Sequence, residues 1–348
     1  MSSPIAPFQF IIGVDTHRDT HAAAILNRHG AHCAALQIPT THAGFRQLLS
    51  FASTQAPGER LWAIEGTGSY GRTLTRFLLE QQEAVSEVER PQRPARRSGA
   101  KSDALDAVRA AREVLAREQL HTPRCSGPNE ALRVLLVARE GAAEAYRRTR
   151  NQLKALILTS PEALRSTLRT LPSAAQLERC ARLRLRNSTT LEQRATVLAL
   201  RSCARRAHYL LHEVHTLEGE LKPLVQQLAP QLLAEAGIAT VHAARILCAW
   251  SQRQRWHSEA AFATLAGVAP LPASSGQTVR YRLSRRGDRR LNRALELIVR
   301  CRLAHHSPTK AYAARRLSEG KNKREIRRCL KRYLARRLFR LLQQPPHT

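Results

Sequence analysis

Five short apolar runs in the N-terminal quarter of the chain have the length of β-strands. They are Phe8–His17, His21–Leu26, Cys33–Ile38, Leu61–Glu65 and Ala84–Val88. A hairpin turn is predicted at Asn27–Gly30, and helical spacing predicts helices over 42–54 and 70–82. A meander of three strands followed by alternating helix and strand predicts a mixed sheet covered by helices, which is an α/β domain.

Beyond residue 100 the apolar positions recur with the period of helices. Ser102 can cap a helix that runs to about Gln119. Long helices are predicted at Glu130–Leu158 and Leu191–Leu228, separated by a stretch that prolines interrupt. Their near-heptad apolar stripes would be buried by pairing as an antiparallel hairpin or across a dimer. Two Arg-rich helices are predicted further on, at Arg289–Ala304 and Lys323–Leu342.

These elements predict three domains and a tail. We expect an α/β domain over 1–122, a helical coiled-coil arm over 123–229, a mostly helical domain over 230–342 and a tail at 343–348. Near the start of the third domain, Gly237-Ile238 is predicted to turn between two short helices. The turn resembles a helix-hairpin-helix element that grips DNA backbone, but Ala239 replaces its second glycine, and simple helix packing explains it equally well.

The charge of the chain is high and unevenly placed. The formal net charge is +30, yet residues 1–89 hold six Arg against eight acids, whereas residues 277–340 hold 22 Lys or Arg against four acids. Nucleotide bias can favour Arg over Lys but does not explain the missing acids. The C-terminal region therefore predicts a polyanionic partner, bound through counterion release. Aromatic residues make up only 5%, which favours backbone and groove contacts over a base-stacking platform.

Four carboxylates stand in positions that suggest a shared site. Asp15 and Glu65 end apolar strands, and Asp103 and Asp106 share one face at the start of a helix. Acids in a first turn also favour the helix dipole, so this pair has a second explanation. Four neighbouring carboxylates repel one another, and a divalent cation resolves the conflict. Their hard oxygen atoms predict Mg²⁺, which can support phosphoryl transfer.

A serine and a set of basic residues are candidates for holding nucleic acid. Ser275 precedes Gly276 on a Pro-rich loop, where guanidinium groups could clamp a phosphodiester for attack by the hydroxyl. Ser-Ser-Gly is also ordinary loop chemistry. The candidate nucleic-acid-binding residues are Arg96, Arg97, Lys101, Arg280, Arg282, Arg285, Arg286, Arg289 and Arg290.

Other features narrow the location and chemistry of the protein. Seven scattered cysteines without a C-x-x-C pair predict reduced thiols. The chain has no apolar stretch of about eighteen residues and no secretory signal, so we expect no membrane span and an intracellular protein. His208, His212 and His215 share a helical face, for which solvent exposure is a simpler explanation than metal binding.

Several blocks together resemble the DEDD-type insertion-sequence transposases, the family that includes the Piv DNA invertase. The blocks are Gly13–His21 (GVDTHRDTH), Glu65–Tyr70 (EGTGSY), Lys101–Ala107 (KSDALDA) and Phe262–Gly276. The resemblance covers nearly the whole chain. It implies a ribonuclease-H-like, RuvC-like N-terminal domain, a coiled-coil arm and a C-terminal transposase domain.

The resemblance also implies residue roles and partners. Asp15, Glu65, Asp103 and Asp106 would bind Mg²⁺, and Ser275 would be a DNA-linked nucleophile. The protein would be a cytoplasmic, nucleoid-associated prokaryotic protein. It would act as a homo-oligomer, a dimer or tetramer, with a structured noncoding guide RNA that pairs with donor and target DNA. Two alternatives stay open: a RuvC-like structure-specific nuclease that uses the acids alone, and a non-catalytic nucleic-acid-binding protein with a decayed metal site.

Overall fold

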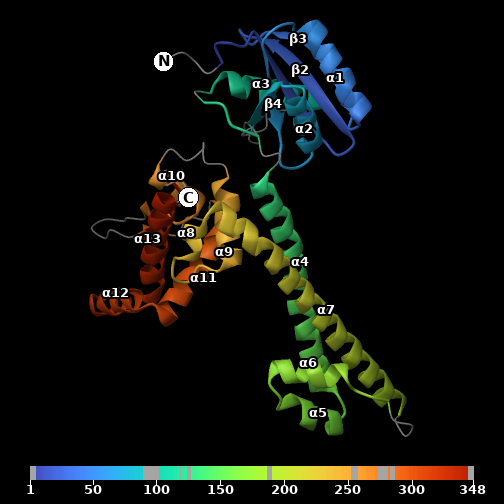
Figure 1. The fold of residues 1–348 in the computed structure, drawn as a ribbon, viewed down its shortest axis with the longest axis vertical. Coiled ribbons are helices and arrows are strands. Elements are labelled where there is room, and N and C mark those ends of the chain that lie inside the picture. The colour runs from blue at the N-terminus through green and yellow to red at the C-terminus, as the bar shows by residue number, and fades with distance from the viewer. Residues whose placement is uncertain are drawn as a thin grey trace. The chain divides into compact units, whose positions relative to one another are not determined.

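The computed structural model describes most of the chain as two compact units. The first unit ends at Glu130, and the second begins at Ala131 and takes in everything described after it (Figure 1). The described residues are 5–88, 102–117, 119–123, 127–185, 190–251, 258–272, 281–282 and 287–343.

A five-stranded mixed sheet, in the order β3-β2-β1-β4-β5, forms the first unit. β2 is antiparallel to β1 and β3, whereas β1, β4 and β5 are parallel to one another. The predicted mixed sheet, with its meander of three strands, is confirmed. The strands are β1 (Phe10–Thr16), β2 (Thr20–Asn27), β3 (His32–Pro39), β4 (Arg60–Glu65) and β5 (Ala84–Val88).

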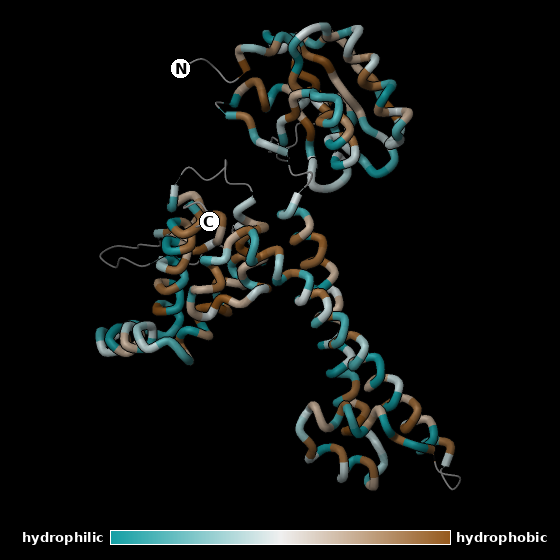
Figure 2. Tube along the Cα trace, viewed as in Figure 1, coloured by the Kyte–Doolittle hydropathy of each residue, from teal (hydrophilic) through white to brown (hydrophobic). Residues whose placement is uncertain are grey.

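Helices cover both faces of the sheet because alternate strand residues point to opposite sides. Ile12 and Val14 of β1 pack with buried residues of α1 and α2, whereas Ile11 packs with α3. Figure 2 shows the hydrophobic residues concentrated in these strands. The helices are α1 (His42–Gln55), α2 (Arg72–Glu80) and α3 (Asp103–Leu115).

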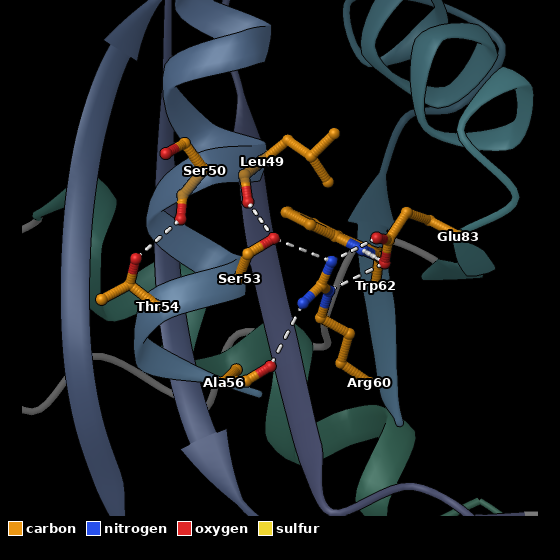
Figure 3. A network of polar contacts seen from close by, with 8 residues as sticks. All are labelled: Leu49, Ser50, Ser53, Thr54, Ala56, Arg60, Trp62 and Glu83. Atoms are coloured by element: carbon orange, nitrogen blue, oxygen red, sulfur yellow. Dashed lines mark hydrogen bonds and ion pairs between the residues drawn. The ribbon is translucent and has the colours of Figure 1, made fainter. Parts of the chain in front are cut away.

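A half-buried polar network fastens α1, β4 and the start of β5 (Figure 3). Arg60 Nε and Trp62 Nε1 donate to Glu83 Oε2 at 2.9 and 2.7 Å, and Arg60 also pairs with Glu83 Oε1. Arg60 Nη1 donates to Ala56 O, and Nη2, which also pairs with Glu83, donates to Ser53 Oγ, each at 3.3 Å. The network satisfies an ion pair whose side chains are only 13% and 12% exposed, so neither charge is left buried alone.

Two predicted helix boundaries in this unit are wrong. α2 begins at Arg72 rather than at residue 70, because Ser69 N donates to Gly66 O at 2.8 Å and closes a turn first. α3 ends at Leu115 rather than near Gln119. Beyond it the chain leaves the helix to satisfy the edge of β5, where Glu87 N donates to His121 O at 2.8 Å.

The second unit contains two long helices, α4 (Pro128–Thr159) and α7 (Leu191–Leu228), which lie antiparallel (Figure 1). Arg139 pairs with Glu218 at 2.6 Å, and Arg206 donates to Gln152 at 2.7 Å. Residue numbers therefore increase along one helix where they decrease along the other. The long helices therefore form a hairpin within one chain. That they supercoil around each other as a coiled coil remains a prediction.

The proline-interrupted stretch holds two helices that the sequence reading missed, α5 (Glu162–Arg169) and α6 (Ser173–Ala181). Pro161 and Pro172 are their N-cap residues, so these prolines begin helices rather than break them. A core of residues from α4 to α7 holds this end of the hairpin together. His208, His212 and His215 are exposed, which confirms the solvated face.

The C-terminal part of the second unit is mostly helical. Gly237, at φ 78°, makes the predicted turn between α8 and α9, and Arg302 Nε of α11 donates to Ala236 O at 2.7 Å beside it. α12 was not predicted, because it buries only Thr309 and so has no apolar stripe. In the described part of the chain, no helix has the length and apolar character needed to span a membrane. The elements are α8 (Pro230–Leu233), α9 (Thr240–Trp250), α10 (Glu259–Leu265), β6 (Leu271–Pro272), β7 (Tyr281–Arg282), α11 (Arg289–His305), α12 (Ser307–Ser318) and α13 (Lys323–Gln343).

Candidate metal centre and basic surfaces

Two of the predicted acids, Asp15 and Glu65, lie side by side at the ends of neighbouring strands. β1 and β4 are parallel, with Val14 paired to Ile64, so Asp15 and Glu65 come next on adjacent strands. Thr16 Oγ1 donates to Glu65 O at 2.9 Å and fixes this end of the pair. Side chains alternate between the two faces of a strand, so Asp15 and Glu65 are on the same face as the residues that pack toward α3. The carboxyl ends of parallel strands are where such sheets present groups to ligands.

The other two acids reach this edge because α3 packs unusually close to β1. A Cβ on Gly13 would lie 1.9 Å from Ala107 O and 2.7 Å from Ala111 N, so only glycine permits the contact. Ser102 caps the helix by accepting from Leu105 N at 3.2 Å. Asp103 and Asp106 occupy the first turn, and the close packing carries that turn toward Asp15.

A histidine that the sequence reading did not assign completes a cluster of possible metal ligands. His17 Nε2 lies 3.2 Å from Asp15 Oδ2 and 3.4 Å from Asp103 Oδ1. One ligand atom from each of these three residues lies within 4.8 Å of the other two. The signal was present in the sequence, because His17 lies two residues after Asp15, immediately beyond the end of β1.

The electrostatics of the cluster favour an added positive charge. Burial raises the pKa of Asp15 above its usual value, the charge of His17 opposes the rise, and the charges of Asp106 and Asp103 add to it. Asp15 is 8% exposed and therefore has little water to screen that repulsion. The positive groups of the cluster therefore do not fully neutralise its negative charge.

The four predicted acids are not equally placed in the cluster. Asp15 and Asp103 belong to it directly. Asp106 acts on Asp15 through its charge, while its Oδ1 pairs with Arg109 Nη1 at 2.5 Å. Glu65 is adjacent to Asp15 through the strand backbone but does not belong to the group formed with His17. The structure therefore brings two of the four acids into one ligand set and leaves two beside it.

The donor set suits a divalent cation. His17 Nε2 is buried and makes no well-directed hydrogen bond, although two carboxylate oxygens lie close to it. Separations slightly above 3 Å are those of atoms that share one ion at roughly 2.1 Å. Carboxylate oxygens favour Mg²⁺ or Mn²⁺, and the imidazole nitrogen adds a donor that softer divalent metals also accept.

Basic side chains of the second unit surround a cavity of about 320 Å³ between α4, α9 and α11. Arg289 and Arg290, both predicted to bind nucleic acid, lie at its edge in the first turn of α11. Cations at a helix N-terminus oppose the helix dipole, so helix stability does not explain them. Arg290 pairs only loosely with Glu140, at 3.6 Å, and its side chain is 66% exposed. The other lining arginines, which the sequence reading missed, are Arg139, Arg147, Arg245 and Arg293.

Arg282 is also among the described residues and lines a separate cavity beside β7. The remaining candidates fall outside the part of the chain that the structure describes. They are Arg96, Arg97, Lys101, Ser275, Arg280, Arg285 and Arg286.

The fold and the cluster together define a class of protein. A five-stranded mixed sheet with acids at the ends of its parallel strands is consistent with a ribonuclease-H-like DEDD domain. The matches to family models agree. A model for the DEDD domain of IS110 elements, described as Transposase, matches residues 12–160, and a second, described as Transposase IS116/IS110/IS902 family, matches residues 229–314.

The chain therefore belongs to the IS110-type DEDD transposases, enzymes that cut and rejoin DNA. The first match spans the acidic cluster, and the second spans the turn at Gly237 and the whole of the basic helix α11. No curated protein matches the chain.

Proposed function

We propose that this transposase recombines DNA with a divalent-metal site at the carboxyl ends of β1 and β4 and a nucleophilic serine, Ser275. The observation that carries the proposal is the convergence of Asp15, His17 and Asp103, with ligand atoms within 4.8 Å of one another. A bound Mg²⁺ or Mn²⁺ would activate a hydroxyl or water and neutralise charge on the phosphate.

The chain's own residues have separable tasks in this proposal. Asp15 and Asp103 hold the cation together with His17. Asp106 adds negative charge next to Asp15, and Arg109 orients its carboxylate. Glu65 lies on the adjacent strand, from which it could complete the ligand set through its own oxygens or a bound water. As the resemblance to the family implies, the Ser275 hydroxyl would attack the phosphorus of a DNA phosphodiester, forming a serine–phosphate bond while the bond from phosphorus to the departing strand's oxygen breaks and that strand leaves with a free hydroxyl.

The partners in the proposal are donor and target DNA, a structured guide RNA and further copies of the chain. The excess of basic residues supports a nucleic-acid partner, because the exposed arginines at the start of α11 exceed the acids beside them. Charge does not distinguish RNA from DNA, so the guide RNA rests on the family resemblance alone. The proposed domain borders are 1–122, 123–229 and 230–342.

A reconstituted reaction tests the function. The purified chain, with the RNA that copurifies with it, is mixed with donor and target DNA in Mg²⁺ or Mn²⁺, and cut and joined strands are resolved on denaturing gels. Asp103→Asn should abolish both products. Ser275→Ala should abolish joining and any covalent protein–DNA adduct.

The alternatives give different results in the same reaction. Full strand cleavage by Ser275→Ala would indicate a hydrolytic nuclease that uses the acidic site alone. Equal behaviour of the unaltered chain, Asp15→Asn and Ser275→Ala would indicate a binding protein without chemistry. Copurification of no discrete RNA would remove the guide from the proposal.

A further inference from the structure

A second cavity in the second unit, of about 370 Å³, has a lining that neither the acidic site nor the family match assigns to a ligand. Its walls are the segment after α10, the residues of β7 and one side of α13. The volume lies near the lower end of the range for small-molecule sites, roughly 300–1,000 Å³. It is therefore suited to a compact ligand rather than to a length of duplex.

Positive charge dominates this cavity. Five cationic residues line it, and Glu325 is the one acid among its described lining residues. Glu325 Oε2 accepts from Asn322 N at 3.0 Å, so it also serves the start of α13. Arg332 Nη1 is buried without a hydrogen-bond partner. The cationic residues are Arg282, Lys321, Arg328, Lys331 and Arg332.

The cationic groups are held in place by the surrounding protein. Lys331, only 6% exposed, points Nζ at Asn292 Oδ1 (3.3 Å) and Glu296 Oε2 (3.4 Å). Asn292 in turn donates to Ala266 O at 2.7 Å and so fixes the start of the opposite wall. Arg328 Nη1 donates to Tyr281 O at 3.0 Å, which joins α13 to β7 and leaves the rest of its guanidinium group for a ligand. The cavity is thus preorganised for an anion.

Two tyrosines add an aromatic surface to the same cavity. Tyr281 is 54% exposed and Tyr333 is 50% exposed, which is unusual for rings that line a cavity. Tyr333 is steadied by an edge-on contact with Tyr312, whose ring centroid lies 5.7 Å away. Val268, Ala269 and Pro270 supply an apolar wall. Aromatic faces beside cations bind a base and its phosphate together.

We propose that this cavity binds one unpaired nucleotide of a DNA or RNA strand, with the base against Tyr281 and Tyr333 and the phosphate on Arg328 and Lys331. The inference rests on the proposed function for its nucleic-acid partner. It adds a single-base site to the backbone and groove contacts that the low aromatic content favours.

Fluorescence anisotropy on the full chain tests the proposal. Titrations in EDTA prevent metal-dependent cleavage, and the probes are a labelled single-stranded DNA, the same strand with abasic sugars throughout, and an RNA of the same sequence. The unaltered chain should bind the base-bearing strand about tenfold or more tighter than the abasic strand. Tyr281→Ala with Tyr333→Ala should remove that ratio and leave the abasic affinity unchanged.

Matched variants exclude a general disturbance. Tyr333→Phe keeps the ring and should keep the ratio, and so should Tyr209→Ala, because Tyr209 is 69% exposed on α7 away from the cavity. Arg328→Gln should weaken binding of both strands. A strand with a single 5-iodouracil should photocrosslink to a peptide that contains Tyr281 or Tyr333, located by mass spectrometry.

The outcomes separate this inference from the proposed function. Tight binding with equal affinity for base-bearing and abasic strands would overturn the nucleotide site alone. A base-dependent ratio that survives the double tyrosine substitution would also overturn it. A chain that binds none of the probes would overturn the nucleic-acid partner itself. A base-dependent ratio confined to the DNA or to the RNA would identify which strand the cavity holds.

Discussion

The two units of the chain have opposite electrostatic imbalances. In the sheet unit, Asp15 and Asp103 gather at one edge with the charge of Asp106 beside them, and the opposing groups are His17 next to Asp15 and Asp103 and Arg109 next to Asp106. In the helical unit, basic side chains outnumber acidic ones around the two cavities, and several of them are exposed. One unit lacks a cation and the other lacks an anion.

The difference supports the partner proposed for each unit. Elsewhere both units neutralise their charges internally, through Arg60 with Glu83 in the sheet unit and Arg302 with Glu235 in the helical unit. Ion pairs are therefore available to this sequence wherever charges have only a structural role. The places where charge is left unmatched are those where a metal or a nucleic acid would supply the balance.

The largest expected effect separates chemistry from binding. Asp15→Asn should lower metal-dependent strand cleavage by about 100- to 1,000-fold, because it removes a charge that acts on the reacting phosphate through the cation. DNA binding in EDTA should be unchanged. Rates from single-turnover cleavage measure the loss, and Asp19→Asn is the control, since the Asp19 side chain is 76% exposed. Equal cleavage rates for Asp15→Asn and Asp19→Asn would show that Asp15 has no special role in the chemistry.

The next effect concerns the helical unit. Replacing Arg289, Arg290 and Arg293 together by Gln should reduce the slope of log affinity against log salt by about 0.9 for each lost phosphate contact. Replacing three exposed arginines of the sheet unit, Arg28, Arg46 and Arg76, should change the slope much less. DNA-binding titrations at several salt concentrations measure both. Similar slopes for the two triple variants would show that the charge is not localised as described.

A smaller effect concerns stability. In EDTA, Asp15→Asn should raise the melting temperature by about 2–4 °C for each kcal/mol of repulsion relieved, because the neutral amide ends the conflict with Asp103 and Asp106. Added Mn²⁺ should stabilise the unaltered chain but not the variant. Differential scanning calorimetry with and without metal gives both values. A variant that melts lower in EDTA would contradict the account.

The smallest effect is a pH dependence that the two units share for different reasons. Burial lowers the pKa of His21 and of His242, and the charges of Arg245 and Arg139 lower the pKa of His242 further. Each folded pKa lies below the unfolded value of 6.5, so stability should fall as pH drops through that value. A DNA oligomer that neutralises the arginines should raise the pKa of His242 and leave that of His21 unchanged. Histidine NMR titrations test this, and equal responses would contradict it.

Much of the sheet unit was predictable from local sequence. Apolar runs that end in Asp15 and Glu65 indicate strands with acids at one edge, and Ser102 marks the start of the helix that carries the other two. The contact at Gly13 was not predictable, because the helix backbone that requires it comes about ninety residues later. His17 could have been found, since it lies only two residues after Asp15, immediately beyond the end of β1.

The helical unit was harder to predict because its sites combine distant elements. Arg139 and Arg245 line one cavity from helices about a hundred residues apart, and neither position has a local signal. α12 lacks the apolar stripe by which the long helices were recognised. The excess of basic residues predicted a polyanionic partner, which agrees with the DNA substrate of a transposase. The positions of the cavities were not predictable, because they depend on how the helices pack.

The proposed metal site can be tested by measuring metal binding to the full chain. Mn²⁺ titrations, read by electron paramagnetic resonance, should show one tightly bound ion per chain. The bound ion should show coupling to an imidazole nitrogen that disappears in His17→Ala, and binding should be lost in Asp15→Asn and Asp103→Asn but kept in Asp19→Asn. Unchanged Mn²⁺ binding in Asp15→Asn and Asp103→Asn would contradict the account.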